Sequence, residues 1–282
     1  MLRLRPLLGL TPFAVFVVLF LVIPTLVVVI GSLLDANNAP TLANLQALTD
    51  SSVLTAFRRS ILLSASTAAV GAVVGGLLAH AVSTARPDGF LRRAVTAASG
   101  VLAQFGGVTL AFAFVATIGL QGLVTVFAKD NLGVDIFAGG VWLFQLPGLI
   151  LVYAYFQIPL MVIVFLPALD GLRAQWREAS DSLGGSTWQY WRHVGGPLLL
   201  PSFLGSALLL FANAFSAYAT AAALVSQGAP IVPLQIRAAL TSEVLLGRAD
   251  LAKALALGMV VVVAVVMTAY ALLQRRTSRW LQ

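Results

Sequence analysis

The side chains that could carry catalytic chemistry are few in this chain of 282 residues. It contains no cysteine, which excludes disulfides, thiol chemistry and thiolate zinc sites. The two histidines, His80 and His193, lie far apart on different expected elements, so an imidazole metal centre is nearly excluded. No Gly-x-Ser-x-Gly elbow, His-Glu-x-x-His pair or facing membrane carboxylates appear. We therefore expect a chain with no catalytic residue, no metal site and no cofactor of its own.

A phosphate-binding loop is also missing from the sequence. Such a loop needs Gly-Lys-Ser/Thr after a glycine-rich turn, and both lysines, Lys129 and Lys253, follow alanine instead. If this protein moves a solute uphill, the energy must come from a partner. If it does not, a passive channel or a membrane scaffold is the alternative.

Composition indicates the class of protein to which these residues belong. Hydrophobic residues make up 60% of the chain and charged residues only 10%, whereas soluble domains carry about 25% charged residues. The apolar residues fall in blocks, and no basic face alternates with aromatic residues. These features exclude an ordinary soluble enzyme, a disordered chain and a nucleic-acid-binding protein, and they predict a polytopic membrane protein.

Six apolar stretches are long enough to cross a bilayer as helices, which takes roughly 20 residues each. They define an all-α fold with one transmembrane domain over residues 1–282. The first stretch is too long for a signal-peptide core and has no small-residue cleavage site before Asp35, so we expect it to be retained. We expect Pro147, Pro159 and Pro167 to interrupt the fourth. The expected spans are 10–34, 61–82, 95–120, 141–169, 198–225 and 251–274.

The distribution of basic residues predicts the orientation. Six spans place both termini on one side of the membrane, and that side holds all of the net charge of +7. By the positive-inside rule this side is cytoplasmic. The basic residues on it are Arg3, Arg5, Arg86, Arg92, Arg93, Arg173, Arg177, Arg192, Arg275, Arg276 and Arg279, whereas Arg58, Arg59, Lys129, Arg237, Arg248 and Lys253 lie on the other side.

Between the expected span ends the only ionisable side chain is His80. Ion-driven carriers generally place such groups at mid-membrane to bind the coupling ion. His80 lies near the cytoplasmic end of the second span, where a proton site is possible but a packing or snorkelling histidine is favoured. The chain is therefore expected to lack its own energy-coupling chemistry.

The cytoplasmic segment 170–197 between the fourth and fifth spans is the most informative part of the chain. Helix formers run from Arg173 to Leu183 and stop at Gly184-Gly185, which favours a left-handed helix end. Ser186 or Thr187 can cap a second short helix over 188–194, which we expect to end at Gly195-Gly196-Pro197. An interfacial amphipathic loop and a docking element both fit this pattern. Its aromatic residues are Trp176, Trp188, Tyr190 and Trp191.

The spacing within this segment resembles the signature loop of permease subunits in binding-protein-dependent ATP-binding-cassette (ABC) importers. That family's loop reads Glu-Ala-Ala, three residues, Gly, nine residues, Ile-x-Leu-Pro. Ser180 and Gly196 depart from the pattern, and Val194 is a mild change from isoleucine. The positions that match outright are Glu178, Ala179, Gly184 and Pro197.

The resemblance implies that Glu178, Ala179, Ser180, Gly184 and Pro197 belong to a loop that couples to an ATPase. Glu178 would pair with a basic group of that partner, Ala179 would allow close helix approach, and Gly184 would form the elbow. The alternative for Glu178 is a local pair with Arg177 or a residue one turn away, or a solvated position.

The same resemblance implies a set of partners and a location. The partners would be a dimer of ATP-binding subunits that holds ATP and Mg, a second permease that is more often a paralogue than a copy, and a solute-binding protein. Membrane lipid would surround the chain in a prokaryotic inner membrane, with both termini cytoplasmic. No nucleic-acid partner is expected.

Two further segments resemble the polyamine, ferric-iron and opine branch of these permeases. One is Ala217-Tyr218-Ala219-Thr220 with Leu224, and the other runs from Pro233 to Ala256. This branch implies that the substrate is a small solute delivered by a binding protein, and a polyamine-like solute is the first expectation. The alternatives are a sugar-type importer permease and a passive channel or scaffold without an ATPase.

Polar side chains inside the spans are candidates for the translocation path, because each is costly in hydrocarbon unless it faces a helix or a wet cavity. Tyr153 and Gln157 are four residues apart, and Asn213, Ser216 and Thr220 share one helical face. Helix-to-helix hydrogen bonds are an equally good explanation for each residue alone. Selectivity is expected to rest with the binding protein, since no carboxylate lies mid-span.

Overall fold

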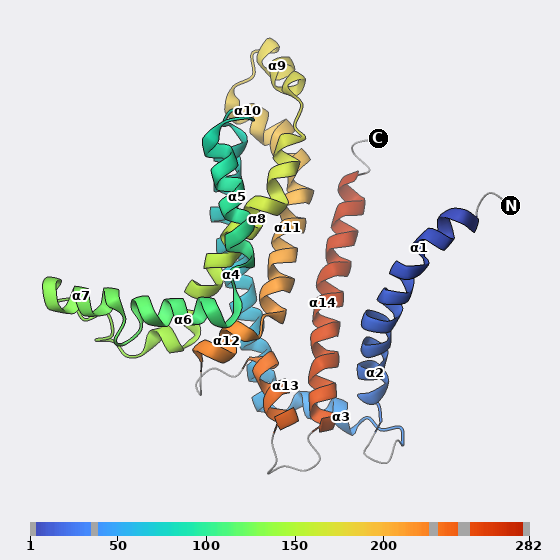
Figure 1. The fold of residues 1–282 in the computed structure, drawn as a ribbon. Helices are drawn as coiled ribbons and strands as arrows, with labels where there is room; N and C mark the ends of the chain where they lie inside the picture. Colours follow the sequence, from blue (N-terminus) through green and yellow to red (C-terminus); the bar gives the residue numbers. More distant parts are fainter. Residues whose placement is uncertain (1–3, 35–38, 226–230, 242–248, 279–282) are drawn as a thin grey trace. The chain divides into compact units, whose positions relative to one another are not determined.

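The computed structural model describes residues 4–34, 39–225, 231–241 and 249–278, and the regular structure in these ranges is helical (Figure 1). The expected all-α class is confirmed. Shorter turns of 3-10 helix occupy Ala47–Thr49 and Trp142–Phe144, and π-helical turns occupy Val18–Val22 and Trp191–Gly195. The α-helices are α1 (Leu4–Val17), α2 (Ile23–Gly31), α3 (Ala43–Gln46), α4 (Ser51–Ser83), α5 (Phe90–Gln104), α6 (Gly107–Ile118), α7 (Leu123–Leu132), α8 (Leu146–Asp170), α9 (Ala174–Ser182), α10 (Thr187–Tyr190), α11 (Gly196–Ser216), α12 (Ala219–Leu224), α13 (Val232–Thr241) and α14 (Ala249–Ser278).

Six helical segments in the described residues are long and apolar enough to cross a membrane, as the sequence predicted. Their limits differ from the expected ones in several places. Of the basic residues used to predict the orientation, Arg3, Arg248 and Arg279 lie outside the described residues. The segments are Leu10–Gly31, Ser51–Ser83, Gly107–Leu132, Leu146–Asp170, Thr187–Ser216 and Leu251–Leu272.

The expected continuous span over 95–120 is wrong, because the helix breaks between α5 and α6. Gly107 adopts a left-handed backbone with φ +74°, which a helix cannot continue through. Its N–H donates to the hydroxyl of Thr220 at 2.9 Å instead of to a carbonyl one turn earlier. The third membrane-length segment therefore combines α6 and α7 and starts twelve residues later than expected.

The fourth and fifth spans also differ from the sequence-based expectation. Pro147 lies in the first turn of α8, where its missing N–H costs no hydrogen bond. Pro159 and Pro167 lie inside an unbroken helix rather than interrupting it. The fifth span does break, since α11 ends at Ser216 and Ala217 is extended before α12 begins.

The chain divides into two compact units. Unit 1 comprises Met1–Phe57 with Ile231–Val262, and unit 2 comprises Arg58–Pro230 with Val263–Gln282. The described part of unit 1 has a small apolar core in which Val53 and Ala56 pack with Val232 and Leu255. The single permease domain inferred from the sequence stays a prediction.

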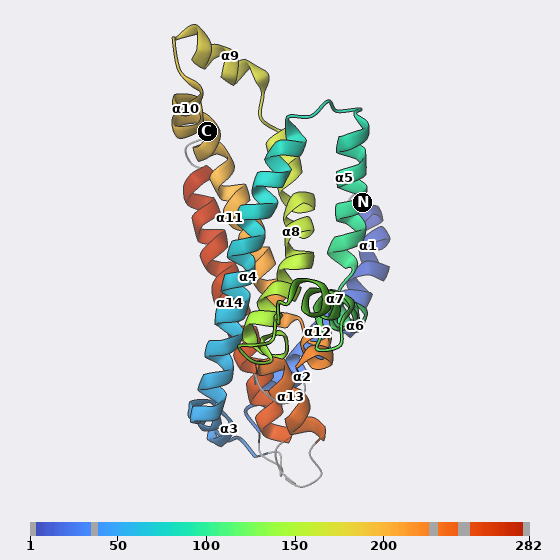
Figure 2. The ribbon, with the colours of Figure 1, turned by 90° about the vertical axis from the view of Figure 1, so that its left-hand side faces the viewer.

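Unit 2 is built on α8, α11 and the part of α4 from Arg58 onward, which run side by side (Figures 1 and 2). Its core joins alanines of α4 with Met161 and Phe165 of α8 and Leu210 of α11. Two glycines of α4 let these helices approach closely. A Cβ on Gly71 would lie 2.9 Å from the Gln157 Cβ, and one on Gly75 would lie 2.5 Å from the carbonyl oxygen of Ile158. The small-residue positions of α4 thus serve helix packing.

Candidate functional site

The segment between α8 and α11 folds as two short helices joined by a glycine turn. α9 ends at Ser182, and Gly184 follows in the left-handed conformation with φ +76°. The Gly184 N–H donates to the Asp181 carbonyl at 3.0 Å, and the Gly185 N–H donates to the Ser180 carbonyl at 2.9 Å. This pair of bonds is a Schellman motif, which satisfies carbonyls at the helix end. The expected left-handed turn at Gly184 is therefore present.

The second glycine of the turn is needed for a different reason. A Cβ on Gly185 would lie 2.8 Å from the Ser180 carbonyl oxygen and 2.6 Å from its hydroxyl. Ser180, which replaces the second alanine of the family pattern, therefore lies directly against the turn. Gly184 supplies the backbone conformation, and Gly185 leaves room for the end of α9.

A complete capping box starts the second helix. The Ser186 hydroxyl accepts from the Gln189 N–H, and the Gln189 side chain accepts from the Ser186 N–H at 2.7 Å. These reciprocal bonds satisfy two backbone donors at the start of α10. Ser186, one of the two residues expected to cap this helix, is the cap.

The expected helix end at Gly195-Gly196-Pro197 is wrong. α10 continues through the π-helical turn Trp191–Gly195 directly into α11, so residues 187–216 form one helical path. Pro197 lies in the first turn of α11, where proline is tolerated. The Gly195 position is filled by neighbours, since a Cβ there would lie 2.9 Å from the Trp191 ring. This glycine accommodates an aromatic ring rather than stopping the helix.

One arginine connects the two short helices across the turn. The Arg177 Nε lies 3.1 Å from both carboxylate oxygens of Asp181, within α9. Its Nη2 donates to the Thr187 hydroxyl of α10 at 2.7 Å. The guanidinium also lies over the Tyr190 ring, 5.2 Å from its centroid. Arg177 therefore fixes the angle between α9 and α10.

The outer surface of this segment is exposed and mixed in character. Glu178 and Ala179 are exposed, and the side chains of Leu183 and Trp188 are 89% and 72% exposed. Arg177 pairs with Asp181 and not with Glu178, and no ion pair of Glu178 occurs among the described residues. The local-pair alternative for Glu178 is thus not realised here. We call Glu178, Ala179, Leu183 and Trp188 the loop face.

The base of the segment is tied to the neighbouring loop. Arg92, at the start of α5, forms an ion pair with Asp170, the last residue of α8. This contact places the 84–92 loop and the 170–197 segment at the same end of unit 2, where Figure 2 shows α9 and α10. Both were assigned to the same membrane side from the sequence.

Two of the five candidate path residues are packed inside unit 2. Tyr153 and Gln157 are fully buried. The Tyr153 hydroxyl donates to the Ala217 carbonyl at 2.8 Å, and the Gln157 amide donates to the Leu210 carbonyl at 2.7 Å. For these two residues the structure has the helix-to-helix hydrogen bonds that were the alternative to a path-lining role, and the Asn213 amide of α11 also donates to the Gln157 side-chain oxygen of α8 at 3.4 Å.

The other three candidates line a cavity of about 230 Å³ in unit 2. Asn213 and Ser216 of α11 are exposed, whereas Thr220 is buried and holds the Gly107 N–H. The cavity lies where the α5–α6 break meets the α11–α12 break, with Gly106 and Gly107 in its wall. Sequence reasoning missed these two glycines, although adjacent glycines inside an apolar stretch are a signal of a helix break.

The curated proteins that the chain resembles are permease proteins of transport systems. No protein-family model matches the chain. It is 27% identical over 198 residues, 68% of its length, to the putative ferric transport system permease protein FbpB 1 of Haemophilus influenzae. It is also 27% identical over 112 residues, 39% of its length, to the thiamine transport system permease protein ThiP of Escherichia coli. These matches cover 30% and 20% of the relatives, so the chain spans less than a third of their length.

Solved structures give the fold. The chain is similar to a chain of a bacterial ABC transporter involved in the import of the acidic polysaccharide alginate, with a TM-score of 0.77, 18% identity, and coverage of 96% of this chain and 95% of the other. It is also similar to a chain of the inward-facing MetNI methionine ABC transporter, with a TM-score of 0.52, 16% identity, and coverage of 81% and 99%. The chain therefore has the fold of ABC importer membrane subunits. Its resemblance to importer permeases, first seen in the 170–197 loop, is confirmed.

Proposed function

We propose that this chain is the membrane-spanning permease subunit of an ATP-driven importer and forms half of its translocation path. The observation that carries this proposal is the ordered segment between α8 and α11. A Schellman turn at Gly184, the capping box at Ser186 and the Arg177 contacts hold the segment in a fixed shape in which the loop face is exposed. A preorganised surface of this kind suits docking, because little conformational entropy is lost when a partner binds.

The chemistry of the loop face fits a protein partner. Leu183 and Trp188 offer exposed apolar anchors, and Ala179 lets another backbone approach closely. Glu178 supplies one charge that can pair with a basic group of the partner and fix the register. ATP and Mg would be bound by that partner, a dimer of ATP-binding subunits, and this chain would itself perform no catalysis.

The continuous helical path from the loop to the cavity suggests how docking of a partner could affect the translocation path. The helical path from Thr187 to Ser216 is about 45 Å long at 1.5 Å per residue. One of its ends is the docking segment, and the other carries Asn213 and Ser216. Continuous secondary elements can carry a displacement from one end to the other, so movement of the loop would reposition these two side chains. The π-helical turn Trp191–Gly195 and Pro201 inside α11 are the points where this path can bend. The two helix breaks beside Asn213 and Ser216 would let α6 and α12 respond.

The translocation path is proposed to run past Asn213 and Ser216, with Thr220 behind them. An exposed asparagine in a membrane-length helix is costly against lipid and is expected to face a wet cavity. Tyr153 and Gln157 support this site from behind rather than line it. The full assembly would include a second permease, a paralogue in the first place, and an extracytoplasmic solute-binding protein. It would lie in a prokaryotic inner membrane with both termini cytoplasmic.

The substrate is proposed to be a small solute delivered by that binding protein. The neutral Asn213 and Ser216 suit hydrogen bonding to a passing solute and provide no charge to hold a cation. The relatives and neighbours named above concern ferric ion, thiamine, alginate and methionine, so a polyamine-like substrate has only the sequence resemblance behind it. A sugar-type importer stays the alternative within the class.

The test is recovery of an ATP-binding subunit with the detergent-solubilised, tagged chain from its native membrane. Wild type is compared with Glu178→Ala and Gly184→Pro, and with Asp130→Ala as the matched control, since Asp130 is an exposed acid of α7 outside the loop. The proposal expects an ATPase to co-purify with wild type and the control and to be depleted with both loop variants. A wild-type chain that emerges alone at every detergent strength would refute the importer function and favour a passive channel or scaffold.

A further inference from the structure

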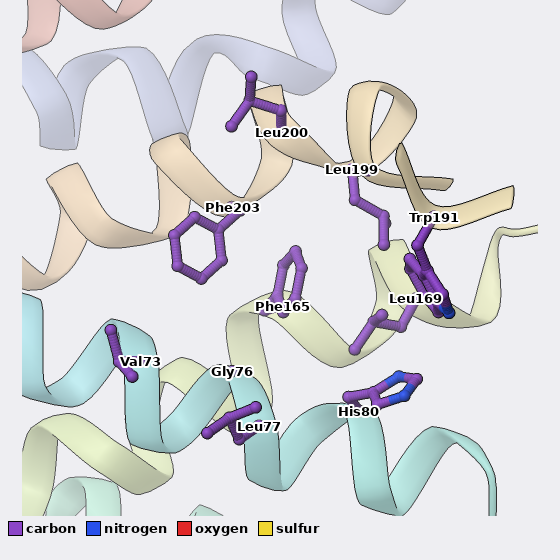
Figure 3. A pocket seen from close by; sticks show the side chains of 11 residues that line it. Val73, Gly76, Leu77, His80, Phe165, Leu169, Trp191, Leu199, Leu200 and Phe203 are labelled. Carbon is purple, nitrogen blue, oxygen red and sulfur yellow. The ribbon is translucent and has the colours of Figure 1, made fainter. Parts of the chain in front are cut away.

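An apolar groove in unit 2 is not used by the proposed function, although Trp191 and Gly196 of the 170–197 segment line it. Its volume is about 560 Å³, and it lies between α4, α8 and the start of α11 (Figure 3). Its floor consists of Phe165, Leu169 and Leu199, which are 5% to 7% exposed. Val73 and Leu77 of α4 form its edge and are 57% and 67% exposed. Within unit 2, the groove is therefore open at the side of three membrane-length helices.

Water is a poor occupant for this groove. A buried water needs two to four polar partners, and the side chains around the groove provide polar atoms only at His80 and Trp191. An empty groove is also unfavourable, because its lining would lose dispersion contacts that a close-packed interior makes. Hydrocarbon satisfies both conditions, and a membrane-spanning helix bundle is surrounded by it.

One end of the groove is polar. His80 and Trp191 meet edge to face there, with ring centroids 5.1 Å apart (Figure 3). The residues that follow Trp191 in the chain, Arg192 and His193, are both exposed and do not line the groove itself. Tryptophan and basic side chains are typical of the level where hydrocarbon gives way to lipid headgroups. An arginine at that level attracts a phosphate.

We infer that the groove is a binding site for a phospholipid, with one acyl chain along the floor and the phosphate at the His80–Trp191 end beside Arg192. From Val73 to His80 the groove follows α4 for about 10 Å at 1.5 Å per residue, so it takes part of one chain. Lipid tails are as apolar as leucine, so burial alone gives no preference for this site. The preference comes from the shape of the groove and from the phosphate contact.

The inference can be tested without measuring transport. The full chain, with any co-purifying subunits, is placed in phosphatidylcholine nanodiscs containing a trace of phosphatidylglycerol with a diazirine in its acyl chain. After irradiation, labelled peptides are located by mass spectrometry. The expected result is stronger labelling of the floor residues Phe165, Leu169 and Leu199 than of Phe112, which is 62% exposed on α6. Labelling that follows surface exposure alone would overturn the inference.

Two groove variants and one control make the test specific. Leu77→Trp fills the groove from its exposed edge and should lower floor labelling several-fold, with Val73→Trp as a second variant should the first fail to insert. Leu62→Trp is the matched control, because Leu62 is a 53% exposed leucine of α4 outside the groove. Equal floor labelling in Leu77→Trp and Leu62→Trp would contradict the site.

The phosphate contact has its own readout. Competition between unlabelled phosphatidylglycerol and phosphatidylcholine at the floor measures headgroup preference. Arg192→Gln should reduce that preference by about tenfold, since a charge-assisted hydrogen bond is worth roughly 1.4 kcal/mol or more. No preference in wild type, or an unchanged preference in Arg192→Gln, would overturn the assignment of the phosphate end.

Discussion

The Nη2 of Arg177 donates a 2.7 Å hydrogen bond to the Thr187 hydroxyl, across the glycine turn that separates α9 from α10. The same guanidinium pairs with Asp181 and covers the Tyr190 ring. Arginine can make these contacts at once because its guanidinium is planar and presents several donors. This one side chain sets the angle at which the loop face is presented.

Arg177→Gln is expected to weaken binding of the proposed ATP-binding partner about fivefold to tenfold, because lost contacts of about 1 to 1.4 kcal/mol would loosen the loop. Arg177→Lys should bind the partner little better than Arg177→Gln, since an ammonium cannot bond both Asp181 and Thr187 in this geometry. The measurement is titration of the solubilised chain with the purified ATPase. Arg86→Gln, which changes an exposed arginine of the neighbouring 84–92 loop, is the control and should bind like wild type.

Gly184→Ala is expected to strain the turn by about 1 to 2 kcal/mol, since Gly184 has φ +76°. Gly133 offers a matched control, because it has φ +66° and no atom lies within 4 Å of its added Cβ, as at Gly184. Both alanine variants should lose similar thermal stability in detergent, but only Gly184→Ala should also lose ATPase binding. If Gly184→Ala and Gly133→Ala lost ATPase binding equally, general destabilisation would explain the loss and the specific role of the turn would be contradicted.

Local interactions explain which parts of the loop could be predicted from the sequence. The left-handed turn at Gly184 and the cap at Ser186 depend on residues within a few positions, and both are present. The continuation through Gly195 and Pro197 was missed, because a glycine followed by proline is also compatible with the start of a helix.

The helix breaks in the spans could not be predicted from local patterns. The α5–α6 break is stabilised by a bond from Gly107 to Thr220, 113 residues away, and the Ala217 carbonyl at the α11–α12 break is held by Tyr153, 64 residues away. Apolar stretches identify membrane-length segments, but they do not indicate which distant side chain satisfies an interrupted backbone. For the same reason, the candidate path residues could not be separated into packed and cavity-lining sets.

Opposite stability effects are expected for two glycines in helices of unit 2. Gly75→Ala would place a Cβ 2.5 Å from the Ile158 carbonyl oxygen, so α4 and α8 must separate, at a cost of about 1 to 3 kcal/mol. Gly100→Ala meets nothing within 4 Å and should stabilise α5 by about 0.5 to 1 kcal/mol. Thermal unfolding of the solubilised variants measures both. A stabilising Gly75→Ala would contradict the close α4–α8 contact.

The candidate translocation path can be mapped by thiol labelling, because the chain has no cysteine of its own. Asn213→Cys and Ser216→Cys are expected to react with a membrane-impermeant maleimide, since exposed thiols in a wet environment ionise and thiols in apolar surroundings do not. Leu210→Cys is the matched control one turn earlier on α11, where the side chain is fully buried, and should stay unlabelled. Labelling is measured in the membrane-embedded assembly. If Asn213→Cys and Ser216→Cys are as unreactive as Leu210→Cys there, these side chains face lipid or protein and the path lies elsewhere.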